Sequence, residues 1–367
     1  MNESIKINWY RCKIDREVLR SLMQKSDARG FAQAVTQLAL FALTGTLAYL
    51  AFVHVRSSPS PGGLGLLLLA LFCHGTVGSF FGGVACHELC HKTPFATPFW
   101  NSFFLRVYAF LAWFDPVGYR ASHVRHHQVT VYADHDGEIV LPNALDRHGL
   151  LFVLRSLTFN PAALGRILAF WVTAACGRLT QDAFFKAAWL RKVIPETNTE
   201  TRRELVVWAR IVLLGHLALA ALFVATGHWF LIVLVTFGCQ YCGWLVTLCG
   251  TAQHAGMSPN VPDFRLNTRT YTCGWLPAFL YWNMQYHVEH HMYPAVPFYN
   301  LPRLRSAIEH DLPRAPHGLI ATWRELVPIL ARQRREPGYF FVPELPSNPG
   351  DRVSDELIQA EASQQTA

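Results

Sequence analysis

Four long stretches of the 367-residue chain contain almost no charged side chains. They cover about residues 31–55, 62–85, 206–226 and 229–250, and Arg210 in the third is the only Lys, Arg, Asp or Glu among them. Each is long enough to cross a bilayer, which takes about 20 apolar residues. Short turns rich in Ser, Pro and Gly, at about 56–61 and 226–228, join them in pairs. The pattern predicts an all-α integral membrane protein with four transmembrane helices in two hairpins.

Basic residues lie almost entirely outside these stretches. Lys and Arg number 7 in residues 1–30, 13 in 86–205 and 10 in 251–367, which makes 30 of the 32 in the chain. Two hairpins place these three segments on one face of the membrane, and basic segments favour the cytoplasmic face. We therefore predict a multi-pass protein with both termini on the cytoplasmic side.

Three further apolar stretches, 99–114, 150–175 and 276–282, are shorter or broken by polar residues and predict helices at the membrane interface. With the rest of 86–205 and 251–330 they would form a helical cytoplasmic cap. We divide the chain into a cytoplasmic segment (1–30), a membrane domain (31–315), a second cytoplasmic segment (316–347) and a disordered tail (348–367).

Composition narrows the class of protein further. Hydrophobic residues make up 51% of the chain and charged residues 16%, with a mean hydropathy of +0.17. This excludes a largely disordered chain and disfavours an ordinary soluble one, which carries about 25% charged residues. The nine Cys are scattered and odd in number, so we expect reduced thiols rather than a disulfide scaffold. The net charge of +7 follows from the cytoplasmic segments, and we expect no nucleic-acid partner.

Histidine is the residue type that suggests chemistry. Eight of the 17 His fall into three groups: His87 and His91; His123, His126 and His127; and His287, His290 and His291. Spacings of three and four residues put the side chains of each group on one face of a helix. Neutral imidazole is a common ligand of iron, zinc, copper and nickel. A ninth, His254, stands alone after the fourth apolar stretch and is a further candidate ligand.

All nine His would meet at the cytoplasmic membrane face. Nine imidazoles exceed the coordination number of one ion, so we predict two metal ions with four or five His each. Iron with open positions for dioxygen explains such a set better than structural zinc, which needs four ligands. A metal transporter or sensor is the alternative from another class, but transporters place their ligands near the bilayer midplane.

The three histidine groups resemble the HxxxH, HxxHH and HxxHH boxes of the membrane fatty-acid desaturase and hydroxylase superfamily. The likeness covers about residues 31–315 and includes Asn283-Met-Gln-Tyr-His-Val-Glu-His-His-Met-Tyr-Pro294 and the Gln253-His254 pair. The HxxxH spacing of the first box, and Gly250 where the stearoyl-CoA branch has Asn, are closer to the acyl-lipid and bacterial branches.

This resemblance implies a non-haem di-iron centre, dioxygen as co-substrate and a fatty acyl lipid or free fatty acid as substrate. It also implies a separate electron donor, a ferredoxin or cytochrome b5 with its reductase, because the sequence contains no His-Pro-Gly-Gly haem motif. Desaturation is the leading reaction. Hydroxylation and oxidative decarboxylation to a terminal alkene are alternatives on the same scaffold.

Charged residues near the boxes have candidate roles. Metal-bound His usually donates its second N–H to a carboxylate, a carbonyl or water, so we expect such partners among Glu88, Asp134, Asp136, Asp263 and Glu289. Arginine pairs with carboxylates and phosphates, which makes Arg120, Arg125, Arg265 and Arg269 candidates for the substrate head group. Aromatic residues such as Trp113, Phe114, Tyr281 and Trp282 predict an apolar tunnel for the acyl chain between the spans and the cap.

Overall fold

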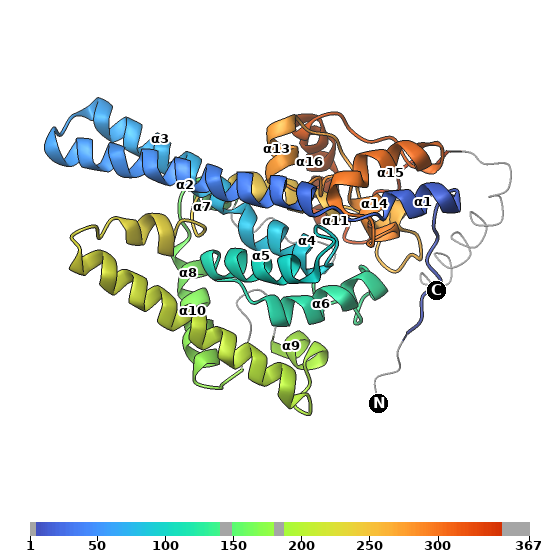
Figure 1. Ribbon diagram of the computed structural model, residues 1–367. Helices are drawn as coiled ribbons and strands as arrows, with labels where there is room; N and C mark the ends of the chain where they lie inside the picture. The colour runs from blue at the N-terminus through green and yellow to red at the C-terminus, as the bar shows by residue number, and fades with distance from the viewer. Residues whose placement is uncertain (1–4, 140–148, 180–186, 347–367) are drawn as a thin grey trace.

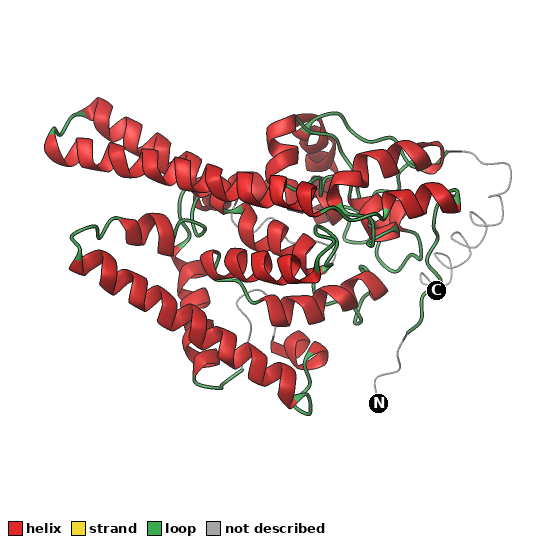
Figure 2. Ribbon diagram, in the orientation of Figure 1, coloured by secondary structure: helices red, strands yellow, loops and turns green. Residues whose placement is uncertain are grey.

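The computed structural model describes residues 5–139, 149–179 and 187–346, and the predicted tail 348–367 lies outside them. The described residues form helices and loops with a few isolated β-bridges and no strand (Figure 2). The helical class is therefore as predicted.

Helices α2 (Asp27–Ser57) and α3 (Pro61–Gly78) form the first long hairpin. Ser26 and Ser60 cap their N-termini by accepting backbone N–H bonds, and Pro61 occupies the first turn of α3, where its missing N–H costs nothing. The second helix continues beyond α3 as the π-helix η1 (Phe81–Ala85) and then as α4 (Cys86–Cys90). In Figure 1 the α2–α3 pair projects away from the cap.

Among the described residues, three helical segments are long and apolar enough to cross a membrane: Asp27–Ser57, Pro61–Cys90 and Thr199–Ala225. They coincide with the first three predicted spans. The third is α10 (Thr199–Ala225), capped by Asn198 and packed against α8 (Pro161–Ala175).

The fourth predicted span, 229–250, is not one continuous helix, and the four-span count stays a prediction. A π-helix, η2 (Ile232–Thr236), is followed by an irregular segment and then by α11 (Trp244–His254). Gly238 explains the break, because a Cβ there would lie 2.0 Å from the carbonyl oxygen of Leu234 and 2.8 Å from the Phe41 ring. The helix is interrupted at this point, where the backbone comes close to α2.

The apolar stretches predicted at the interface are helical: α5 (Pro98–Leu111), α7 (Gly149–Leu157), α8 and α13 (Trp275–Leu280). The other helices of the described residues are, in chain order, α1 (Arg16–Leu22), α6 (Pro116–Val129), α9 (Ala187–Val193), α12 (Phe264–Asn267), α14 (His287–Met292), η3 (Phe298–Asn300), α15 (Leu301–Ile308), η4 (Glu309–Asp311) and α16 (Leu319–Arg335). Helices α1 and α13–α16 gather at the end of the molecule opposite the tips of α2 and α3 (Figure 1).

Candidate metal centre

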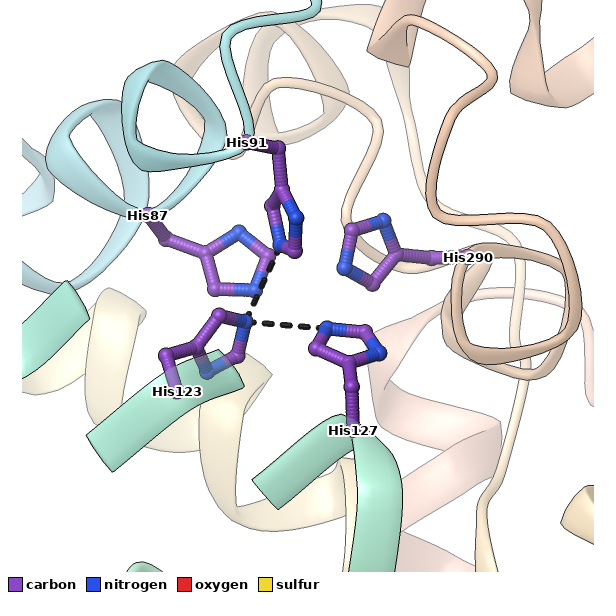
Figure 3. Close-up of side chains that lie close together, drawn as sticks. All are labelled: His87, His91, His123, His127 and His290. Carbon is purple, nitrogen blue, oxygen red and sulfur yellow. Dashed lines mark hydrogen bonds between the residues drawn. The ribbon is translucent and has the colours of Figure 1, made fainter. Parts of the chain in front are cut away.

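Five histidines from three separate segments converge in the first cluster. His87 lies on α4, and His91 is the residue that caps the C-terminus of α4. His123 and His127 lie on α6, and His290 lies on α14. One ring nitrogen from each lies within 4.8 Å of those of the others (Figure 3). The Nε2 atom of His123 is 3.0 Å from the Nε2 atoms of both His91 and His127. We call these residues the five-histidine cluster.

The remaining four box and lone histidines form a second cluster beside it. Ring nitrogens of His126, His254 and His291 lie within 4.8 Å of one another. The Nε2 atom of His287 is 3.0 Å from that of His254 and 3.2 Å from that of His291. The structure thus brings together all nine predicted ligands, in sets of five and four; the four are called the four-histidine cluster below.

Hydrogen bonds at Nδ1 set the direction of six of these rings. The partners are Glu88 for His87 (3.0 Å), Glu138 for His123 (2.8 Å), Asp136 for His126 (2.7 Å), Asn267 O for His254 (3.0 Å), Gln253 for His287 (3.0 Å) and Thr130 for His291 (3.2 Å). A ring held at Nδ1 presents Nε2 to the centre of its cluster. Where the partner is a carboxylate or carbonyl, it takes the Nδ1 proton and leaves the Nε2 lone pair free for a cation.

The clusters fit metal ions better than they fit hydrogen bonding among themselves. Two Nε2 lone pairs facing each other at 3.0 Å repel unless a proton or a cation lies between them. The Nε2 atom of His87 and both ring nitrogens of His290 are buried without a hydrogen-bond partner. Buried polar atoms in native proteins nearly always have a partner, so a cation between the rings accounts for both observations.

Burial keeps most of these imidazoles neutral. It lowers the pKa of His290 and His291 well below the usual histidine range, helped by neighbouring imidazoles, and lowers that of His254 to about 3. His126 differs: burial favours its neutral form, but the Asp136 carboxylate raises its pKa overall. Neutral rings can offer lone pairs to a metal at neutral pH without first losing a proton.

Two of the five predicted carboxylate partners, Glu88 and Asp136, do contact box histidines. The other three do not: Asp134 is exposed in a turn, Asp263 pairs with Arg265, and Glu289 accepts from Thr270 and Arg305. Their closeness in sequence to a box did not place them next to an imidazole.

Glu138 is the carboxylate that the sequence analysis missed. Its Oε1 accepts from His123, its Oε2 accepts from Ser122, and burial raises its pKa to about 7. The signal was the acidic turn Asp134-His-Asp-Gly-Glu138, in which any of three carboxylates could have faced the second box.

The four candidate head-group arginines have different surroundings. Arg265 is buried between Asp263 and Asp311, and Arg269 donates to the carbonyl oxygens of Ala252 and Ala255 at the end of α11. Both are built into the cap. Arg120 is exposed and Arg125 is half-buried, with Gln128 as a neighbour at 3.4 Å.

A cavity of about 400 Å³ borders both clusters. The lining histidines are His87, His123, His126, His254 and His287. Mostly apolar residues complete the wall, among them Gly82, Gly83, Ala112, Phe114, Ile139, Cys239, Gly250, Tyr281 and Met284. No Lys or Arg lines the cavity among the described residues. The π-helix η1 and the irregular segment after η2 therefore both contribute to its wall, and π-helices are frequent at functional sites.

Membrane-length apolar helices, nine converging histidines and an apolar cavity beside them are the features of a membrane protein with candidate metal sites. The family model described as fatty acid desaturase matches residues 57–323, which is more than half of the chain. The chain therefore belongs to the fatty acid desaturase family. The comparison with curated proteins found no match. Membership implies an oxidoreductase that acts on fatty acyl chains.

Proposed function

We propose that this chain catalyses the dioxygen-dependent oxidation of a long acyl chain in the membrane, with desaturation as its reaction. One observation carries the proposal above all: two histidine clusters with converging ring nitrogens border a largely apolar cavity. An acyl chain needs an apolar cavity, and an unactivated C–H bond needs an oxidant within contact distance of the reacting carbon.

Two iron ions are the cofactors that this proposal requires. The five-histidine cluster would hold one and the four-histidine cluster the other, because imidazole suits iron and nine rings exceed one ion's coordination number. The iron ions would supply the activation of dioxygen for C–H cleavage, chemistry that no side chain provides.

The chain's own residues would orient the histidine rings and enclose the acyl chain. Glu88, Glu138, Asp136 and the Asn267 carbonyl hold the Nδ1 atoms of their histidines, which fixes each ring for its ion. Phe114, Tyr281 and Met284 provide apolar or aromatic surface against which an acyl chain packs and from which it excludes water. Arg265 and Arg269 already bind buried partners within the protein. Arg120 and Arg125 are therefore the remaining candidates for binding the substrate head group.

We also propose that the centre and both termini are cytoplasmic and that electrons come from a separate ferredoxin or cytochrome b5. The basic residues clustered in 1–30, 86–205 and 251–367 support this orientation.

The deciding experiment is expression in cells that lack such an enzyme, with lipid and volatile profiling. The matched control is His287→Ala, which removes one imidazole from the four-histidine cluster. We expect a new double bond in wild-type cells and none in the variant. A hydroxy acid or a terminal alkene would instead identify hydroxylation or decarboxylation. An unchanged lipid profile in cells that contain iron-loaded protein would contradict oxidation of acyl chains.

A further inference from the structure

An N-terminal segment, residues 5–13, crosses the cap and is held there by buried polar groups. Tyr10 donates its backbone N–H to Pro262 O at 2.8 Å and its hydroxyl to Asp311 at 2.5 Å. The guanidinium of Arg265, which is paired with Asp311 at 2.6 Å, lies 3.8 Å from the centre of the Tyr10 ring. Tyr293 donates to the carbonyl of Cys12. These contacts give the segment a defined place.

The segment sets Trp9 against the metal-binding core. The Trp9 ring stacks on Phe264 with centroids 4.1 Å apart and an interplanar angle of 11°, and its Nε1 donates to Gln128 O at 3.0 Å. Phe264 is fully buried, and its ring centroid lies 5.3 Å from that of His291 in the four-histidine cluster. Trp9 itself is only half-buried. Two aromatic rings therefore lead from the surface to a candidate metal ligand.

Exposed basic residues flank Trp9 in the sequence. Lys6, Arg11 and Lys13 are exposed on the same segment. The exposed Asp134 lies two residues after Tyr132. The Tyr132 ring meets the Trp9 ring edge-on, with their centroids 5.8 Å apart. Lys192 donates to the backbone carbonyl of Asp134 at 2.5 Å, which brings a further positive charge to this turn.

We propose that residues 5–13 and the adjoining end of α6 form the docking surface of an acidic one-electron carrier protein, and that Trp9 and Phe264 connect it to His291. The proposal rests on the oxidase function proposed above, which needs external electrons. Electron-transfer encounters use small, weak interfaces, and opposite charges steer their association. Tunnelling falls off steeply across open gaps, so a stacked pair of rings favours this entry point.

Each docked carrier gives up one electron and leaves oxidised, so one desaturation consumes two carriers. The acyl chain loses two hydrogen atoms to form the double bond. Together with two electrons and two protons, these hydrogens reduce one dioxygen molecule to two water molecules. Neither aromatic ring is consumed.

Binding is tested first, on metal-free protein, with a reduced plant-type ferredoxin as the acidic probe. The double variant Lys6→Glu/Lys13→Glu reverses two exposed charges and leaves the buried contacts of the segment in place. We expect its Kd for ferredoxin to rise about tenfold or more at low ionic strength and to depend less on salt. Arg324→Glu, an exposed residue of α16, is the matched control and should bind like wild type. Equal binding by the double variant and the control would overturn the docking surface.

The electron path is tested with Trp9→Ala, and Trp9→Phe is the variant that keeps a stacking ring. Because truncating a central Trp commonly weakens an interface tenfold or more, we expect kcat/KM for ferredoxin to fall about tenfold in Trp9→Ala. The rate with dithionite as reductant and the metal content should stay at wild-type levels, and Trp9→Phe should recover most of the ferredoxin-driven rate.

Two results would overturn the path: an unchanged ferredoxin-driven rate in Trp9→Ala, or equal losses with ferredoxin and dithionite together with lost metal. The second result would make Trp9 a packing residue only. Failure of the proposed oxidase function looks different, because metal-loaded wild-type protein would then form no product with either reductant.

Discussion

At the scale of single residues, the Nδ1 partners decide what the histidine clusters can bind. Glu138 holds the His123 ring at 2.8 Å, and the Nε2 atom of that ring faces those of both His91 and His127. Without this contact His123 could rotate and bring Nδ1 to the centre. The carboxylate also stabilises the positive charge that a metal places on the ring.

We therefore predict that Glu138→Gln lowers iron affinity by roughly 10–100-fold, the usual effect of losing a carboxylate partner of a metal-bound histidine. Titration of metal-free protein with iron, followed by elemental analysis, measures this. Asp134→Asn is the control, because Asp134 is exposed four residues earlier in the same turn. Equal affinities in wild type and Glu138→Gln would show that the contact does not support a metal ligand.

His290 allows a second test because both of its ring nitrogens are buried without a hydrogen-bond partner, and the nearest carboxylate oxygen, of Glu88, is 3.8 Å from Nδ1. If it is a ligand, His290→Ala should cost the five-histidine cluster its ion, and iron per chain should fall from about two ions to about one. His74 is the control: it is equally buried, but Thr44 and Leu234 O occupy its nitrogens at 3.0 and 2.9 Å. Equal losses of iron in His74→Gln and His290→Ala would contradict the assignment of His290 as a metal ligand.

The nine histidines could be predicted because helical spacing is a local property of the sequence. Most of the residues that bond their Nδ1 atoms could not be predicted in this way. Glu138 reaches His123 from 15 residues away, and Asn267 reaches His254 from 13. Arg265 shows the same limit, because its partner Asp311 lies 46 residues further along the chain. Proximity in sequence to a histidine therefore predicted two true partners, Glu88 and Asp136. It also predicted three residues that contact no box histidine: Asp134, Asp263 and Glu289.

At the scale of elements, the π-helix η1 forms part of the cavity wall within the second predicted span. It places Gly82 and Gly83 in the wall of the cavity beside His87. A Cβ added at Gly83 would meet no atom within 4 Å. Gly83 is exposed and lines the cavity, so a side chain added there would start in open space at the cavity wall.

Gly83→Leu should therefore keep its metal and shorten the cavity. We expect products from shorter acyl chains or oxidised at another carbon, with a change in preference of roughly tenfold or more for each methylene excluded. Gly65→Leu is the matched control, since Gly65 is equally exposed and unobstructed but is not among the residues that line the cavity. Product profiling of purified variants measures the effect. An active Gly83→Leu enzyme with the wild-type profile would tell against substrate in this cavity.

Hydropathy located the first three spans because a continuous apolar helix is a local property of the sequence. It could not reveal the break in 229–250, which depends on how closely Gly238 approaches α2 and α3. The Cβ of any other residue there would also lie 2.9 Å from His74. The same break brings Cys239 and Gln240 to the cavity wall.

At the scale of the whole molecule, the contacts of His254 bear on how often the chain crosses the bilayer. If α2, α3–α4 and α10 each cross once, α4 ends on the N-terminal side and α10 ends on the opposite side. Yet His254, 29 residues after Ala225, has its Nε2 3.0 Å from that of His287, and its ring lies 5.4 Å from that of His126. The chain must therefore return across the membrane between residues 226 and 254.

That return does not require an unbroken helix. Irregular backbone is tolerated at membrane depth where protein satisfies its polar groups. Trp113 donates to Thr236 O at 2.7 Å, Gln240 donates to Ala112 O at 2.8 Å, and Cys242 N donates to Thr158 O at 2.7 Å. We therefore expect four crossings, the last through η2 and α11, with both termini on the cytoplasmic side.

Reporter fusions measure this topology. A cytoplasm-active reporter should be active when fused after residue 30, within 187–198 or after residue 346, and inactive within the turns at 58–60 and 226–228. The charge distribution gives the same sidedness, because 30 of 32 basic residues lie in the segments predicted to be cytoplasmic. Opposite activities for the fusions after 30 and after 346 would mean three crossings. His254 could then not share a face of the membrane with His126, so the result would also contradict the four-histidine cluster.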